Sequence, residues 1–246
     1  MAEINNFLPL MLDLSGRKIV IFGGGSVGER KAELFSGCAD TLVASLEFSQ
    51  RLQELEASGK VRLVRLDLLG ASDSELRELI SGAFIVIPAT SNFELNQKIA
   101  AIARESDILI NQVDALGSVI IPSVIKRGDL VIGISTLGHS PAVSKYTRRQ
   151  IESLVTPEYS DMIRLQDELR SYLKQHVAEQ RQRKAILWKV LESEAVWSGF
   201  SESYEKAAER AYAIILGCLE ISAGKSLKGS EEAGETKNVK NFQNTP

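Results

Sequence analysis

The chain has 246 residues, 44% of them hydrophobic and 25% charged, which is ordinary for a water-soluble globular protein. Its net charge of −3 disfavours general nucleic-acid binding, and no apolar run is long enough to span a membrane. Cys38 and Cys218 are too few for a disulfide framework or a cysteine metal site, and the first residues lack the basic start of a signal peptide. We therefore expect a cytoplasmic protein.

A glycine-rich turn follows the first strongly apolar run. Residues 19–22, Ile-Val-Ile-Phe, predict a buried strand, and a helical pattern begins near Ser26. Between them, Gly23, Gly25 and Gly28 have the G-x-G-x-x-G spacing, which allows a tight turn, close approach of the backbone to a pyrophosphate and close helix–strand packing. The helix start would add N–H groups and a positive dipole end for phosphates. We predict a dinucleotide site; the alternative is a glycine-rich turn in an unrelated α/β protein.

The first 114 residues alternate strand patterns with helical patterns. Continuous apolar runs suit strands that are buried on both faces of a parallel sheet. The alternation predicts a Rossmann-like, doubly wound α/β domain over residues 1–114, with NAD as its ligand. The predicted strands are 19–22, 41–44, 61–66, 84–87 and 108–110, and the clearest helical patterns are 74–80 and 94–105.

The pattern changes after residue 114. Two apolar runs, 119–121 and 130–134, predict β structure around a turn at 126–129, and the chain has a helical pattern from Pro141 onward, with Thr156 and Ser201 as candidate N-caps. Such a small β segment would gain by pairing with a second copy, so we expect a homodimer. We divide this part into a β, dimerisation and substrate segment at 115–150, a helical domain at 151–224 and an unstructured tail at 225–246.

Polar residues follow two predicted strands at the edge where an open α/β sheet binds ligands. Thr90 follows 84–87 and could contact a ribose or cap the next helix, for which Asn92 is the other candidate. Asp114 follows 108–110 and could be a general base, although an Asp in this position is also a good turn former.

The choice of nicotinamide cofactor depends on the end of the second strand. NAD-binding folds commonly place an acid there to bind the ribose hydroxyls. This chain has Ser45 and Leu46 at that point, with Glu47 slightly beyond, and it has no arginine there to favour a 2′-phosphate. We expect NAD.

A basic segment lies within this acidic chain. Between residues 126 and 149 there are five basic residues and one acid, Asp129, so the segment could attract an anionic ligand; a solvated surface is the alternative. A turn, STLGHSPAVSK, leads from this segment into the predicted helix and offers a second possible anion-binding terminus. The candidate substrate residues are Lys126, Arg127, Thr136, His139, Ser140, Lys145, Arg148 and Arg149.

Taken together, these segments resemble the precorrin-2 dehydrogenase family, which includes the N-terminal part of siroheme synthases. The resemblance covers residues 10–173 and rests on GGGSVGERKAELF, PATSNFELNQKI, NQVDALGSVIIPSVIKRGDLVIGIST and STLGHSPAVSKYTRRQIE. It implies NAD-dependent oxidation of precorrin-2 to sirohydrochlorin, on the route to siroheme. Because precorrin-2 is highly anionic, it would be a natural partner of the basic segment.

The resemblance also assigns roles to residues. It implies that Asp114 is the catalytic aspartate and that the second-strand acid is absent from the family as well. It implies a dinucleotide site formed by Gly23, Gly24, Gly25, Ser26, Val27, Gly28, Ser45 and Leu46. To these we add Thr90 as a cofactor-binding residue because of its place after the predicted strand at 84–87. The chain departs from the family pattern at Gln112, at Val119 and at Leu137, which stands where a glycine is common.

Two alternatives remain open. Some relatives also insert iron, so the chain could be a bifunctional dehydrogenase and ferrochelatase, although the sequence has no metal-ligand cluster and we assign no metal site. The chain could instead be a non-catalytic module that binds NAD or a tetrapyrrole. Turnover of precorrin-2, and of sirohydrochlorin with Fe²⁺, would distinguish these functions.

Overall fold

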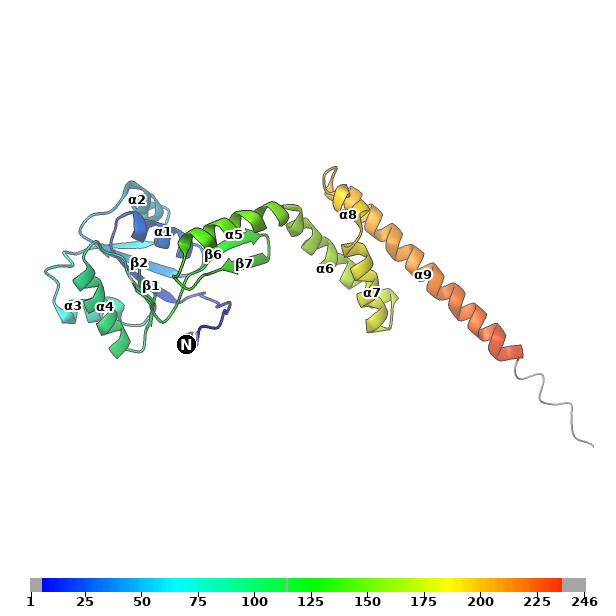
Figure 1. Ribbon diagram of the computed structural model, residues 1–246, viewed down its shortest axis with the longest axis horizontal. Coiled ribbons are helices and arrows are strands. Elements are labelled where there is room, and N and C mark those ends of the chain that lie inside the picture. The colour runs from blue at the N-terminus through cyan, green and yellow to red at the C-terminus, as the bar shows by residue number, and fades with distance from the viewer. Residues whose placement is uncertain (1–5, 114, 236–246) are drawn as a thin grey trace, which may run out of the picture. The chain divides into compact units, whose positions relative to one another are not determined.

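The computed structural model describes residues 6–113 and 115–235 (Figure 1). Within these ranges, side chains are described as far as Glu220. The chain forms two compact units. The first comprises Met1–Pro122 together with Ser135–Ser140, and the second comprises Ser123–Ile134 together with Pro141–Pro246. Each unit is described by itself.

The first unit contains a parallel five-stranded sheet in the order β3-β2-β1-β4-β5. The strand order reverses beside β1, because β2 and β3 lie on one side of it and β4 and β5 on the other. This arrangement confirms the predicted Rossmann-like fold. The strands are β1 (Lys18–Phe22), β2 (Asp40–Ser45), β3 (Arg62–Arg65), β4 (Ala83–Pro88) and β5 (Leu109–Ile110); the helices are α1 (Ser26–Phe35), α2 (Gln50–Ala57), α3 (Asp73–Ile80) and α4 (Phe93–Glu105).

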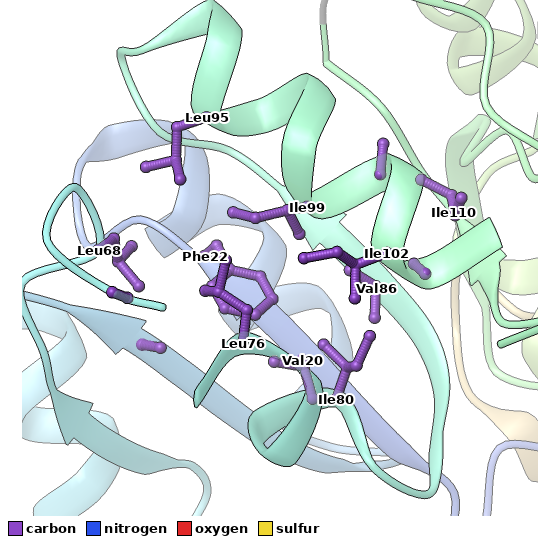
Figure 2. Close-up of a cluster of buried hydrophobic side chains, with 14 of the residues drawn as sticks. Val20, Phe22, Leu68, Leu76, Ile80, Val86, Leu95, Ile99, Ile102 and Ile110 are labelled. Atoms are coloured by element: carbon purple, nitrogen blue, oxygen red, sulfur yellow. The ribbon is translucent and has the colours of Figure 1, made fainter. Parts of the chain in front are cut away.

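The central strand β1 is buried on both faces. Val20 and Phe22 belong to the hydrophobic cluster under α3 and α4, whereas Ile19 and Ile21 belong to the cluster under α1 and α2. Successive side chains of a strand point to opposite faces, so one apolar run supplies both layers of the core. Figure 2 shows the first cluster, in which Phe22 lies among side chains from α3 and α4.

Polar side chains fix the starts of two helices in this unit. Ser72 caps α3: its Oγ accepts from the backbone N–H of Glu75, while the Glu75 carboxylate accepts from Ser72 N–H and Oγ–H at 2.8 and 2.7 Å. These bonds hold the pKa of Glu75 below its ordinary value. Asn92 caps α4, with its Oδ1 accepting from Leu95 N–H at 2.9 Å, so of the two candidates Asn92 is the cap.

The second unit begins with an antiparallel hairpin, β6 (Ser123–Arg127) and β7 (Leu130–Ile134). The predicted strand at 119–121 is wrong: the strand begins after Pro122, which has no N–H to donate. Val119 and Ile121 instead pack against the core of the first unit. The predicted turn is present, and Gly128 in it has φ +57. A Cβ added to Gly128 would lie 2.2 Å from Ser160 Oγ.

Five helices follow the hairpin in the part of this unit that the structure describes. One hydrophobic cluster joins α6 to α9 through residues such as Leu165, Leu169, Val190 and Ala211. The helices are α5 (Pro141–Leu154), α6 (Glu158–His176), α7 (Gln180–Leu191), α8 (Glu194–Gly199) and α9 (Tyr204–Glu235).

The ends of these helices differ from the predicted ones. Pro157, not Thr156, is the N-cap of α6. Ser203 rather than Ser201 caps α9, because Ser203 Oγ accepts from Lys206 N–H at 3.1 Å. The helix α9 continues to Glu235, into the segment for which no regular structure was expected. Extending an existing helix adds one hydrogen bond per residue, and Lys, Leu, Glu and Ala are good helix formers.

Candidate functional site

A cavity of about 430 Å³ lies at the carboxyl ends of the strands in the first unit. Its lining comes from the glycine turn after β1 and from the segments that follow β2, β3 and β4. The glycine turn is central, because β1 lies between β2 and β4 in the sheet. The reversal of strand order beside β1 is where dinucleotides bind in folds of this kind.

Two glycines in this turn are required by the protein itself. Gly23 has φ +118, and a Cβ on it would lie 2.5 Å from the backbone oxygen of Ala89, at the end of β4. A Cβ on Gly24 would lie 2.0 Å from the backbone oxygen of Glu47, beyond β2. These close approaches bring the loops after three strands against one another, and they define the walls of the cavity.

Gly25 is different, since nothing lies within 4 Å of the Cβ position at this residue. Its φ of −82° is open to any amino acid, so the fold does not explain the glycine. It lines the cavity and precedes α1, whose start has no side-chain cap. A Cβ here would occupy space that a phosphate could fill beside the backbone N–H groups of the helix. The residues present therefore fit a dinucleotide pyrophosphate.

A buried asparagine holds the loop after β4 in place. Asn96 on α4 is 4% exposed, and its Oδ1 accepts from Thr90 N–H at 3.1 Å and from Thr90 Oγ–H at 2.7 Å. Its Nδ2 donates to Thr90 O at 3.0 Å. The Thr90 hydroxyl also accepts from Asn92 N–H. Because its single hydrogen is already donated to Asn96, it can form a further hydrogen bond only as an acceptor. Asn96 is not among the residues predicted from the sequence; its signal there is a polar residue on the apolar face of a helix.

The loop after β3 supplies a second group that was not predicted from the sequence. Asp67, Leu68 and Leu69 line the cavity. Among the lining residues that the structure describes, Asp67 carries the one charged side chain. Its Oδ1 accepts from Leu69 N–H at 3.1 Å. The signal in the sequence is an acid just past the predicted strand at 61–66.

The structure brings together most of the predicted cofactor residues. Gly28 is the exception, because it faces β1 rather than the cavity. Glu47, the acid nearest to the end of β2, does not line the cavity. The predicted residues in the lining are Gly23, Gly24, Gly25, Ser26, Val27, Ser45, Leu46 and Thr90.

The predicted base, Asp114, lies outside the described residues. Described residues that follow it in the sequence are hydrogen-bonded to residues at and just after the end of β5. Val119 N–H donates to Ile110 O, Ser118 Oγ accepts from Ile110 N–H at 2.7 Å, and Asn111 Nδ2 donates to Val119 O at 3.0 Å. Asn111 is buried, and its Oδ1 has no hydrogen-bond partner within the described part of the chain.

The five basic residues of the predicted substrate segment belong to the second unit. Lys126, Lys145 and Arg149 are exposed, and none forms an ion pair with a described residue. Arg127 donates from Nε to Val155 O at 3.0 Å, just after α5, and Arg148 pairs with Glu152. The first three cations are therefore available to an anionic ligand, whereas the other two are engaged within the unit.

The remaining predicted substrate residues lie in the turn 135–140 of the first unit. Thr136 Oγ1 accepts from Ser140 N–H and donates to Ser140 O, closing the turn before α5. His139 is exposed. Leu137 has φ +55, a left-handed conformation that favours glycine. This explains why a glycine at that position suits the turn.

The geometry defines a dinucleotide-binding α/β protein, and comparisons with known proteins agree. Residues 10–123 match the family model described as "Putative NAD(P)-binding". A curated precorrin-2 dehydrogenase of Methanosarcina barkeri is 90% identical over 215 residues, which are 87% of this chain and 96% of that protein. The chain therefore belongs to the precorrin-2 dehydrogenase family.

Two further relatives extend the comparison. Siroheme synthase 1 of Yersinia enterocolitica is 32% identical over 182 residues, which cover 73% of this chain but 37% of that protein. The solved structure of SirC, a precorrin-2 dehydrogenase, matches with a TM-score of 0.65 at 22% identity, over 84% of this chain and all of that one. The SirC match supports the fold described above.

Two kinds of feature are absent from the described residues. Over residues 6–113 and 115–235, no helix is both long and apolar enough to cross a membrane. The same residues contain no group of three or more His, Cys, Asp or Glu side chains that could hold a metal ion.

Proposed function

We propose that this chain oxidises precorrin-2 to sirohydrochlorin with NAD⁺ in siroheme biosynthesis. The single observation that carries the proposal is 90% identity to a curated precorrin-2 dehydrogenase along 96% of that protein. The cavity supports it, because Gly25 leaves room that the fold itself does not need. Bound NAD⁺ supplies a hydride acceptor; the protein must hold it, place the tetrapyrrole and remove a proton.

The cavity suggests how NAD⁺ would be oriented. The pyrophosphate would lie at Gly25 and the start of α1, where N–H groups and the helix dipole favour negative charge. In folds of this kind the adenosine half lies toward the second strand. The nicotinamide half would then lie toward the loop after β4, which Asn96 holds in place through Thr90.

For proton removal we propose Asp114. In the sequence it follows β5, and β5 pairs with β4, the strand before the loop toward which the nicotinamide half would lie. A well-placed general base contributes about 10²–10⁴ to the rate. Ser118 and Val119, which follow it in the sequence, are each hydrogen-bonded to the backbone of Ile110, which precedes it.

For substrate binding we propose the exposed cations of the second unit, Lys126, Lys145 and Arg149. Precorrin-2 is highly anionic, and unpaired cations would attract it and raise its association rate. Thr136, His139, Ser140, Arg127 and Arg148 remain proposals of the same kind. Of these, Thr136, Ser140, Arg127 and Arg148 also have the structural contacts described above.

We also propose that the chain acts as a cytoplasmic homodimer. No residue of α5 is buried in a single copy, although the helix is amphipathic. Val143, Tyr146 and Leu154 of α5 and Val131 of β7 are exposed apolar side chains of the second unit. Apolar surface of this kind is typical of an interface between subunits.

The decisive experiment is anaerobic incubation of the full chain with precorrin-2 and NAD⁺, followed by the sirohydrochlorin absorption spectrum. Asp114→Asn should lower the rate by about 100-fold or more while NAD⁺ still binds. Turnover near the wild-type rate in this variant would remove Asp114 from the mechanism. NAD⁺ binding without any turnover in the wild type would favour a non-catalytic module. Sirohydrochlorin and Fe²⁺ without NAD⁺ would test the ferrochelatase alternative.

A further inference from the structure

We propose that Asp67 makes the cofactor cavity selective for NAD⁺ over NADP⁺. The proposal rests on the proposed function, since it concerns the same cavity. It assigns to the loop after β3 a task that other dinucleotide folds give to an acid at the end of the second strand. Three observations support it: the position of Asp67 just after β3, its charge in an otherwise uncharged described lining, and the absence of Glu47 from that lining.

Asp67 lies on the side of the glycine turn toward which the adenosine half of a bound dinucleotide would extend. It lies two residues beyond β3, and the strand order β3-β2-β1 places β3 on the same side of the glycine turn as β2. The cavity includes Ser45 and Leu46 after β2 as well as Asp67 and its two neighbours after β3. A ligand whose pyrophosphate lay at the glycine turn would therefore extend its adenosine toward Asp67.

No positively charged side chain among the described lining residues balances the negative charge of Asp67. Neither lysine nor arginine is among the described residues of the lining. One carboxylate oxygen, Oδ1, accepts from Leu69 N–H, whereas Oδ2 has no hydrogen-bond or ion-pair partner among the residues described. An uncompensated carboxylate repels an anionic ligand unless it meets hydrogen-bond donors. The adenosine of NAD⁺ carries such donors. The 2′-phosphate of NADP⁺ replaces one of them and adds negative charge.

Glu47 is excluded from this role. It is the acid that the sequence offers nearest to the end of β2, yet its side chain does not line the cavity. Its backbone oxygen lies 2.0 Å from the Cβ position of Gly24, which places its main chain against the glycine turn. Glu47 and Asp67 are both exposed acids beyond neighbouring strands, so they form a matched pair for a test.

The test is calorimetric titration of the full chain with NAD⁺ and with NADP⁺ in the absence of tetrapyrrole, for wild type, Asp67→Asn and Glu47→Gln. The Asn variant keeps an oxygen that can accept from Leu69 N–H, so the loop should be preserved, and thermal melting of each variant verifies this. We expect wild type to prefer NAD⁺ and Asp67→Asn to reduce the ratio of the two affinities by about 10-fold, chiefly by tightening NADP⁺ binding. Glu47→Gln should keep the wild-type ratio.

Three results would overturn the proposal. They are equal affinity of the wild type for both dinucleotides, an unchanged ratio in Asp67→Asn, and a ratio that changes in Glu47→Gln instead. In each case NAD⁺ still binds and precorrin-2 oxidation can still be measured, so the proposed function would survive. If neither dinucleotide binds to the wild type, the proposed function fails and this proposal fails with it.

Discussion

The backbone oxygen of Gly23 lies 1.9 Å from the position that a Cβ on Gly28 would occupy. This contact joins the first turn of α1 to the end of β1. No side chain can enter it without moving helix and strand apart. Gly25, three residues before Gly28 in the same G-x-G-x-x-G motif, has nothing within 4 Å of its Cβ position. The motif therefore contains glycines with two different physical roles.

The first prediction separates these two roles. Gly28→Ala should lower the free energy of unfolding by about 3 kcal/mol, because the extra methyl overlaps backbone. Gly25→Ala should lower the free energy of unfolding by no more than about 1 kcal/mol. Alanine is a poorer N-cap than glycine, but its methyl group would contact no other atom. Gly25→Ala should nevertheless weaken NAD⁺ binding at least 10-fold, by analogy with a lost charge-assisted hydrogen bond of about 1.5–3 kcal/mol. Denaturant unfolding and calorimetry provide the two measurements, and equal destabilisation by both changes would contradict this division.

The second prediction concerns the asparagine that holds the loop after β4. Asn96→Ala removes the acceptor of Thr90 N–H and leaves buried polar groups unpaired, which should cost about 2–3 kcal/mol. Because Thr90 lines the cavity, the KM for NAD⁺ should rise as well. Glu94→Gln, an exposed change on the same helix, is the control and should leave both quantities near their wild-type values. An unaltered KM in Asn96→Ala would show that the loop does not depend on this clamp.

The third prediction concerns the backbone of the turn before α5. Leu137→Gly should raise the free energy of unfolding by up to about 1 kcal/mol, because glycine relieves left-handed strain and this gain exceeds its entropic cost. Asp107→Gly is the matched control at φ +54. Its gain should be smaller, since aspartate tolerates this conformation. A less stable Leu137→Gly variant, by thermal melting, would refute the argument from strain.

A fourth prediction distinguishes two adjacent cations. Arg127→Ala should destabilise the second unit by about 1 kcal/mol, because it removes the bond to Val155 O after α5. Lys126→Ala should leave stability unchanged and weaken tetrapyrrole binding, since Lys126 is exposed and unpaired among the described residues. Chemical denaturation and substrate titration measure the two effects. If Lys126→Ala lost as much stability as Arg127→Ala, the distinction would fail.

The fifth prediction concerns acid. The hydrogen bonds from Ser72 depress the pKa of Glu75 below 4.5 in the folded state. A depressed carboxyl pKa stabilises the fold above the ordinary pKa, and the contribution is lost as the pH falls through the folded value. NMR titration should therefore give Glu75 a pKa below its ordinary value, and Ser72→Ala should return this pKa toward the ordinary value. A Glu75 pKa that Ser72→Ala leaves unchanged would exclude the capping box as its cause.

Sequence patterns predicted the first unit well because its signals are local. The apolar run at 19–22 is buried on both faces, and a turn of fixed spacing follows it, so strand, glycine turn and helix could all be inferred. Asp67 and Asn96 could not be found in this way. Their significance depends on which loops lie around the cavity, and that arrangement is set by strand pairing over long sequence separations.

The errors after residue 114 have a similar origin. The run at 119–121 is as apolar as a strand, but its residues pack on the sheet of the first unit, and the hairpin starts after Pro122. Ser201 and Ser203 are both reasonable caps by residue type. Only the path of the chain after α8 decides that Ser203 Oγ reaches Lys206 N–H.

The uncharged character of most of the cavity lining has a thermodynamic consequence. Because neither lysine nor arginine belongs to its described residues, a dinucleotide bound there would be held by backbone N–H groups and a helix dipole. Its binding would displace few counterions, so its affinity should depend less on ionic strength than that of a ligand held by exposed side-chain cations. Capture of an anionic tetrapyrrole by exposed cations would weaken steeply with added salt. Added salt would therefore lower occupancy by the tetrapyrrole more than occupancy by the dinucleotide.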